Sequence, residues 1–458
     1  PAAANPSGIG IAELFRVPPE DERDWMGQAR GNAWSRFFLA LDRAVRAAEP
    51  LLPRNHRQRA IDAAMTFVRE RLNGEDGLGA IFPAMANAVM AYAALGRPPD
   101  DPERATAMGS VRRLLTIGAD EGYCQPCLSP VWDTGLALHA LMEAGVAGAP
   151  IRRGVEWLLD RQILDVAGDW AVQRPDVRPG GWAFQYRNDH YPDVDDTAVV
   201  ALALHRSGVG REDPRVGPAI DRAVEWIVGL QSRNGGWGAF DADNVHHRLN
   251  HIPFADHGAL LDPPTSDVTA RCLACLGGLG HAAAPAAVRG LEFLRGEQEK
   301  DGSWFGRWGT NYVYGTWSTL TALNAMGVSP ASPLVARGVD YLVATQRADG
   351  GWGEDGATYW EERRGFARAS TSSQTAWALL ALMAAGAVDH PAVARGVRWL
   401  LEAPAEGPFW AEPWYTAVGF PRVFYLRYHG YRAYFPLWAL ARWARLTREG
   451  GDRVVHAL

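Results

Sequence analysis

Two kinds of helical pattern alternate along most of the chain. Segments of the first kind are apolar on most faces, and they are 132–141, 196–204, 268–276, 316–325 and 373–384. Segments of the second kind are amphipathic and precede most of the first kind. Helices that are apolar all round belong inside a packed assembly, whereas amphipathic helices belong on its surface. Strand-like alternation is scarce, so the pattern predicts an all-α protein.

A sequence motif recurs at the end of the amphipathic segments. An Arg and a small residue precede an aromatic–aliphatic pair, which is followed by Gln and then by Gly-x-Trp. The copies contain Gln231 and Trp237, Gln298 and Trp304, and Gln346 and Trp352, and looser copies begin at Arg153 and Arg395. The Gln side chain can bond free backbone groups at helix ends, while the Trp ring packs over the neighbouring outer helix. Helix pairs that repeat in this way predict an α/α barrel closed into a ring.

The repeats define one domain, and the residues before them are predicted to form a second one. Residues 129–458 are predicted to form the barrel, and residues 1–128 a second helical domain. Within 24–50, apolar residues recur at helical spacing between arginines, namely Trp34, Phe37, Phe38, Leu41 and Val45. This predicts an amphipathic helix that either packs on the protein or lies in a membrane interface. The longest apolar stretch, 376–388, is too short for the roughly 20 residues that span a bilayer.

Composition narrows the classes of function. A net charge of -6 argues against nucleic acid as the main partner. The chain contains 19 Trp residues, an unusually large number of bulky aromatic rings. Its four cysteines form two Cys-x-x-Cys pairs, but one pair lies in an apolar helical run and no nearby His completes a zinc site. We therefore expect four reduced, structural thiols in a cytoplasmic compartment.

Three carboxylates occur within four residues where the segment 196–204 begins: Asp193, Asp195 and Asp196. Helix capping accounts for one of them, or two. Like charges this close cannot all ionise in a dry site, so at least one carboxyl is expected to keep its proton near neutral pH. A carboxylic acid that keeps its proton in apolar surroundings is a general acid. From the residues alone, capping and acid catalysis both remain open.

The chain resembles the squalene–hopene cyclases, a family of class II terpene cyclases. The likeness is carried by the Asp-x-Asp-Asp motif, by the Gln…Gly-x-Trp repeats and by strings that begin at Ser129, Gly180, Asn250, Asp262, Trp304 and Gly419. It covers essentially the whole chain, although roughly the first third of a family member is missing from it. The resemblance implies an α/α barrel catalytic domain at 129–458, with residues 1–128 as the C-terminal part of a second α/α barrel domain.

The resemblance also implies a reaction and its catalytic residues. The reaction is proton-initiated polycyclisation of squalene to hopene, hopanol or both, in hopanoid biosynthesis. Asp195 corresponds to the proton donor, with Asp193 and Asp196 as its supports. Where the family has an Asp and a His four residues apart, this chain has Asp267 and Arg271, and a permanently charged guanidinium could polarise Asp195 without carrying protons. Acid chemistry of this kind implies no metal and no other cofactor.

Aromatic faces can stabilise a carbocation without trapping it. The resemblance implies that the substrate meets ten such rings: Trp132, Phe184, Phe240, Phe254, Trp308, Tyr314, Phe420, Phe424, Tyr428 and Tyr431. It adds Ile81, Phe82 and Pro83 from the first domain. Phe240 stands where some relatives have Tyr, and Phe82 where some have Gln, so the site is expected to be drier. Whether the reaction ends by deprotonation or by water capture stays open.

The family's partners and location follow from the same resemblance. We expect squalene as substrate, a membrane interface reached through segment 24–50, a homodimer, and a place on the cytoplasmic side of the bacterial inner membrane. Three alternatives remain, namely a class II cyclase for another isoprenoid, a helical-barrel glycosidase and a non-catalytic toroid that binds a partner. A glycosidase needs two carboxyls on separate elements, roughly 5–10 Å apart. A non-catalytic toroid has no use for three clustered Asp residues.

Overall fold

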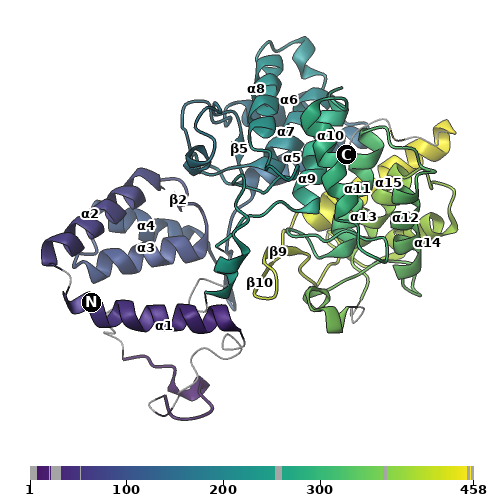
Figure 1. Cartoon of the computed structure of the whole chain (residues 1–458). Coiled ribbons are helices and arrows are strands. Elements are labelled where there is room, and N and C mark those ends of the chain that lie inside the picture. The colour runs from purple at the N-terminus through teal and green to yellow at the C-terminus, as the bar shows by residue number, and fades with distance from the viewer. Residues whose placement is uncertain are drawn as a thin grey trace. The chain divides into compact units, whose positions relative to one another are not determined.

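The computed structural model describes residues 8–19, 21, 32–51, 53–252, 260–364, 369–450, 454 and 458 (Figure 1). The chain forms two compact units. The first, which we call the helical unit, comprises Pro1–Leu128 and Val245–Leu261. The second, the barrel unit, comprises Ser129–Asn244 and Asp262–Leu458.

Six inner helices form the centre of the barrel unit. They are α5 (Pro130–Glu143), α7 (Val194–Arg206), α9 (Ser266–Gly278), α11 (Tyr312–Ala325), α13 (Ser372–Ala384) and α15 (Tyr431–Glu449). Each packs against the next in this order, and α15 packs back against α5, so the ring is closed. Four of them, α7, α9, α11 and α13, are buried on nearly all faces, and in α13 every residue is buried. The predicted all-α barrel is therefore confirmed, with α15 as an inner helix that the sequence pattern did not predict.

Five outer helices surround this ring. They are α6 (Ala149–Leu159), α8 (Val216–Gly229), α10 (Pro285–Gly296), α12 (Pro333–Thr345) and α14 (Pro391–Glu402). Each packs against the inner helix that precedes it in the chain. Only one face of each is apolar; in α6 it is formed by Ile151, Val155 and Leu158, which are buried. This spacing is that of a single helix face, as predicted for the outer layer.

The repeated motif ties each outer helix to the next. The Gln231 side-chain amide donates to the carbonyl of Gly235 (2.7 Å) in its own turn and to that of Ala286 (2.8 Å) in the following outer helix. The indole N–H of Trp237 donates to the carbonyl of Ile227 (2.7 Å) near the end of its own outer helix. The same bonds recur at Gln298 with Trp304 and at Gln346 with Trp352. Backbone carbonyls at helix ends are thereby satisfied, which is the structural role predicted for the motif.

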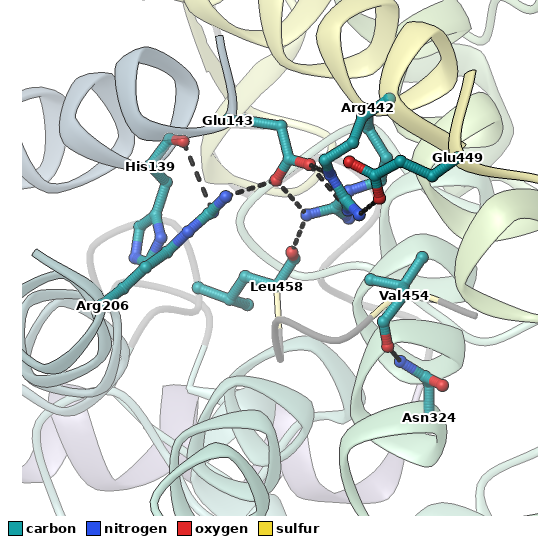
Figure 2. A network of polar contacts seen from close by, with 9 residues as sticks. His139, Glu143, Arg206, Asn324, Arg442, Glu449, Val454 and Leu458 are labelled. Carbon is teal, nitrogen blue, oxygen red and sulfur yellow. Dashed lines mark hydrogen bonds and ion pairs between the residues drawn. The ribbon is translucent and has the colours of Figure 1, made fainter. Parts of the chain in front are cut away.

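A buried ion cluster joins the first and last inner helices (Figure 2). The Glu143 carboxylate, on α5, accepts hydrogen bonds from Arg442 (3.0 Å) and Arg445 (3.0 and 3.1 Å) on α15, and from Arg206 on α7. The side chains of Glu143 and Arg442 are fully buried. Burial by itself would raise the pKa of Glu143, but Arg442 and Arg206 outweigh it and hold the pKa below its ordinary value.

The same end of the barrel holds two residues that follow α15. Arg442 donates to the carbonyl of Leu458, and Asn324 donates to that of Val454 (3.0 Å), as Figure 2 shows. Arg206 ends α7 while Asp195 lies in its first turn. A helix of this length spans about 18 Å, so the ion cluster and the acidic motif occupy opposite ends of α7.

Short antiparallel strand pairs occupy the connections. They are β1 (Leu72–Asn73) with β2 (Gly77–Leu78), β3 (Leu115–Ile117) with β4 (Gly122–Cys124), β5 (Trp182–Ala183) with β6 (Pro192–Asp193), β7 (Ala405–Glu406) with β8 (Phe409–Trp410), and β9 (Ala417–Phe420) with β10 (Phe424–Leu426). Single 3₁₀ turns lie at Ala12–Leu14, Glu49–Leu51, Asp169–Val172, Val209–Arg211, His247–His251, Gly356–Tyr359 and Glu361–Arg363. Two of the strand pairs, β5–β6 and β9–β10, carry residues of the candidate site.

The helical unit contains α1 (Ala33–Ala48), α2 (Arg54–Arg71), α3 (Phe82–Ala94) and α4 (Pro102–Arg113). Its small core consists of Ala88, Tyr92 and Ala107, with apolar residues of α2 packed against them. The helix predicted within 24–50 is observed as α1, and residues 24–31 of that segment lie outside the described residues. Among the described helices, none combines the length and the apolar character needed to cross a bilayer.

Candidate active site

The three carboxylates of the acidic motif meet at the N-terminus of α7. Asp193 is the N-cap, and its Oδ1 accepts hydrogen bonds from the backbone N–H groups of Asp195 (3.1 Å) and Asp196 (3.5 Å). Pairing of β5 with β6 holds this turn, because the Thr197 hydroxyl accepts from the N–H of Trp182 (2.9 Å) and donates to the carbonyl of Asp193 (2.6 Å). The exposed fractions of Asp193, Asp195 and Asp196 are 5%, 7% and 2%. Capping thus accounts for one carboxylate of three.

Burial and mutual repulsion favour a stored proton in this cluster. Burial raises the pKa of Asp193 well above its ordinary value, and the nearby carboxylates of Asp195 and Asp196 raise it further. Burial, followed by Asp195 and Asp133, likewise raises the pKa of Asp196. Asp196 Oδ1 is buried and has no hydrogen-bond partner in the described structure. A raised pKa favours the protonated form, so Asp193 and Asp196 are disposed to carry protons.

The carboxylates are also close enough to bind a cation. One oxygen from each lies within 4.8 Å of the others, and no other group of His, Cys, Asp or Glu in the described residues has this arrangement. A cation would have to compete with protons for these oxygens, since metal ligands must be deprotonated. Because burial and the neighbouring carboxylates raise the pKa values of Asp193 and Asp196, protons compete strongly for these oxygens. All four cysteines are free thiols, as expected.

Asp267 and Arg271 are both buried on α9, but they face different partners. Asp267 Oδ2 accepts hydrogen bonds from the backbone N–H groups of Arg307 (2.9 Å) and Trp308 (2.8 Å). The Arg271 guanidinium carbon lies 4.1 Å from the centre of the Trp317 ring, and its Nη2 reaches the Tyr314 hydroxyl at 3.5 Å. In the described structure Arg271 makes no ion pair, and its Nε and Nη1 have no hydrogen-bond partner. A buried, unpaired cation thus lies among aromatic rings.

Four of the predicted rings form a connected group. The Trp132 indole on α5 donates to the Tyr431 hydroxyl on α15 (2.9 Å). Tyr431 packs against Tyr428 with ring centres 5.0 Å apart, and Tyr428 packs against Phe184 at 5.8 Å. Trp132 and Tyr431 are buried, while Phe184 and Tyr428 are half-buried. Residues from three separate parts of the chain thus come together in the barrel unit.

Tyr314 joins this group through rings that are not among the predicted lining residues. Its ring centre lies 4.9 Å from that of Trp377 on α13, which in turn lies 5.8 Å from Tyr431. Trp317 stacks on Trp377 at 5.9 Å, and Phe435 packs edge-on against both. Trp317 and Trp377 lie within segments predicted to be inner helices. Their position in these segments could have identified them as buried rings.

The remaining predicted rings of the barrel unit form two pairs. Phe240 packs edge-on against Trp308 at 6.0 Å, and Phe420 lies 6.2 Å from Phe424 across the turn between β9 and β10. The guanidinium of Arg307 lies over both Trp308 (4.2 Å) and Phe420 (5.9 Å), and it links the pairs. All four rings are half-buried.

The other predicted contacts belong to the helical unit. Ile81 forms a β-bridge with Cys127, and the N–H of Phe82, at the start of α3, donates to the carbonyl of Pro126 (2.9 Å). Phe82 and Pro83 are exposed on this unit. Phe254 lies outside the described residues.

Comparison with known proteins places this geometry in a family. A family model for the squalene–hopene cyclase C-terminal domain matches residues 128–445, and one for the N-terminal domain matches residues 1–120. The chain belongs to the squalene–hopene cyclase family. The fold of this family is also found in ent-copalyl diphosphate synthase from Streptomyces platensis, which aligns with a TM-score of 0.51 at 19% identity, over 83% of this chain and 60% of that one.

Individual squalene–hopene cyclases match over nearly the full chain. The enzyme of Bradyrhizobium diazoefficiens is 55% identical over 463 residues, which cover 99% of this chain and 70% of the relative. That of Alicyclobacillus acidocaldarius is 46% identical over 447 residues, which cover 96% and 69%. The family predicted from the acidic motif and the repeats is thus confirmed, and with it the class of enzyme, a class II terpene cyclase.

Proposed function

We propose that this chain is a squalene–hopene cyclase, which protonates a terminal alkene of squalene and guides the polycyclisation to hopene, hopanol or both. The barrel unit is the proposed catalytic domain; it lies within the predicted 129–458, from which Val245–Leu261 belongs instead to the helical unit. The observation that carries the proposal is a buried cluster of three carboxyls, two of them with raised pKa values, at the N-terminus of an inner helix in a barrel rich in buried rings. Relatives named squalene–hopene cyclase, 46–55% identical over almost the whole chain, favour this function over another isoprenoid substrate.

Asp195 is the proposed general acid. It donates its proton to one carbon of the terminal double bond, so that a tertiary carbocation forms on the other carbon and Asp195 becomes a carboxylate. Two features stabilise that carboxylate. The N-terminus of α7 carries the positive end of the helix dipole, and the raised pKa values of Asp193 and Asp196 favour their neutral, proton-bearing forms.

Arg271 is proposed to balance the charge that Asp195 leaves behind. Its guanidinium is unpaired and buried, and both it and Asp195 act electrostatically on the Tyr314 hydroxyl, so it is proposed to favour the ionised form of Asp195 without donating a proton. The rings around it, Trp132, Tyr314 and Trp317, offer faces on which positive charge can be tolerated. The carbocation can therefore move away from Asp195 along the lining rings instead of collapsing back onto it.

An Arg271→Gln variant is expected to lose squalene turnover by roughly 10- to 100-fold, because one preorganised charge near the acid is removed. Arg271→Lys keeps the charge and should retain more activity than Arg271→Gln. Both rates are measured by product formation under saturating substrate. Undiminished turnover in Arg271→Gln would remove Arg271 from the mechanism.

The proposed function is tested by incubating the protein with detergent-dispersed squalene and analysing the extract by gas chromatography–mass spectrometry. Pentacyclic C30 products are expected, and heat-denatured protein is the control. Cyclised products from a shorter isoprenoid, with none from squalene, would favour another class II cyclase. No product from either would contradict an enzymatic function and leave a binding toroid. A glycosidase is disfavoured because the three clustered carboxyls lie on one turn and not on separate elements.

We also propose that α1 lies in a membrane interface. Its apolar face is exposed on the helical unit: the exposed fractions are 41% for Trp34, 55% for Phe37, 47% for Leu41 and 58% for Val45. The helix is amphipathic and its polar residues include Arg36, Arg43 and Arg46, a composition typical of helices that bind membrane surfaces. Such a location would let squalene pass from the bilayer without crossing water.

A Trp34→Ser/Phe37→Ser double variant is expected to bind liposomes about tenfold more weakly or worse, because two large side chains would no longer be buried in lipid. Binding is measured by co-sedimentation with vesicles that contain anionic lipid. Val172→Ser, which changes an exposed apolar residue of the barrel unit, is the matched control and should bind as the wild type. Equal binding by the double variant would refute the membrane role of α1.

The resemblance to the family supports two further proposals. The chain is proposed to act as a homodimer on the cytoplasmic side of the inner membrane. Sedimentation velocity in detergent tests the dimer, and a purely monomeric species at micromolar concentration would contradict it.

A further inference from the structure

Arg307 bridges two of the ring pairs in the barrel unit. Its guanidinium carbon lies 4.2 Å from the centre of the Trp308 ring and 5.9 Å from that of Phe420. Its Nη1 is buried without a hydrogen-bond partner, and in the described structure the side chain forms no ion pair. Burial lowers the pKa of Arg307, while Asp267 and Asp262 oppose that effect. A guanidinium in this position contacts rings instead of a carboxylate.

Hydrogen bonds hold the backbone of Arg307 and of the two residues that follow it. Asp267 accepts hydrogen bonds from the N–H groups of Arg307 and Trp308. The Trp308 carbonyl accepts from the N–H of Val418 (3.0 Å), and the next residues form a β-bridge between Gly309 and Ala417. The segment that carries Trp308 and the strand that carries Phe420 are therefore fixed to each other through their main chains. What remains to be set is the orientation of the two rings.

We infer that Arg307 is a positioning residue that fixes the orientation of Trp308 and Phe420 relative to each other, and thereby controls how far the cyclisation proceeds. The inference rests on the proposed function, in which these rings stabilise the carbocation. A planar guanidinium can stack on an indole and still reach a second ring, which an alkyl chain or an ammonium group cannot do equally well. Without it the rings can turn away from the cation.

The consequence is a change of products. A carbocation that meets a misplaced ring is stabilised less, so it loses a proton before the last rings have formed. The proton passes to a base or water, and a C30 alkene with fewer rings leaves the site. The ratio of incompletely cyclised to pentacyclic products therefore reports on Arg307, whereas a loss of overall stability would lower the total yield without changing that ratio.

Arg307→Met tests this inference, since Met keeps an unbranched stem but has neither charge nor planar group. The share of incompletely cyclised products is expected to rise about threefold or more, with a fall in kcat and a nearly unchanged KM. Arg307→Lys keeps the charge but not the planar group, so the share of incompletely cyclised products should rise less than in Arg307→Met. Arg161→Met is the matched control, because the Arg161 guanidinium carbon lies 3.7 Å from the Trp157 ring on the outer helix α6, away from the predicted lining.

A double variant separates positioning from other roles. If Arg307 acts through Trp308, then adding Arg307→Met to Trp308→Phe should change the product ratio less than it does in the wild type. Wild-type product ratios in a folded Arg307→Met protein would overturn the inference, as would fully independent effects of the two changes. Should Arg307→Met fail to fold, Arg307→Lys decides by the same ratio. Absence of cyclised products from the wild type would instead refute the proposed function.

Discussion

An Asp195→Asn variant is expected to lose squalene turnover by about a thousandfold or more, while its melting temperature stays close to that of the wild type. The amide has nearly the shape of the carboxyl group but cannot act as an acid. An isolated alkene is a very poor base, so a weaker donor such as water cannot replace Asp195. The fold should tolerate the change because the cap bonds at the start of α7 are made by Asp193 and not by Asp195.

The matched control is Asp101→Asn in the helical unit. Asp101 caps α4 by accepting from the N–H groups of Glu103 and Arg104, and Asn caps helices about as well as Asp. This variant should keep full activity. Both proteins are assayed with squalene by gas chromatography–mass spectrometry and by thermal unfolding. Turnover by Asp195→Asn within tenfold of the wild type would mean that another group delivers the proton.

The sequence predicted that three carboxylates gather at a helix start, but not which of them is the cap. Any of the three could occupy that position, since all are favoured there. The pairing of β5 with β6 decides it, because the strand ends at Asp193 and leaves Asp195 and Asp196 inside the first turn. Such a two-residue strand leaves no recognisable alternation in the sequence.

Long-range contacts limited the prediction in the same way at Asp267 and Arg271. Their spacing on one helix is local and readable from the sequence. Their partners are not, because Asp267 bonds the amides of Arg307 and Trp308, some 40 residues away in the chain, and Arg271 lies over Trp317. The helix α15 was not recognised as an inner helix because Arg442 and Arg445 lower its apolar character. Inside the barrel, Glu143 neutralises part of their charge.

The substitution with the largest expected effect on stability lies in the buried ion cluster around Glu143. Glu143→Gln should lower the free energy of unfolding of the barrel unit by about 3–5 kcal/mol, because it removes the carboxylate that compensates buried arginines on α7 and α15. Arg442 is fully buried, so water cannot solvate the charge left behind. Urea unfolding followed by tryptophan fluorescence measures the effect. Glu212→Gln is the control, since it removes one partner of an exposed pair with Arg152 and should leave stability nearly unchanged.

Glu143→Gln and Asp195→Asn should fail in opposite ways, because they act at opposite ends of α7. Glu143 joins α5 to α15, which are about 300 residues apart in the chain, and so closes the ring (Figure 2). At temperatures where Glu143→Gln is still folded, the acid cluster is expected to be intact and the rate per folded molecule close to that of the wild type. Asp195→Asn should instead be stable and inactive. A Glu143→Gln protein that is stable but inactive would show that the ion cluster shapes the distant acid site and does not merely close the barrel.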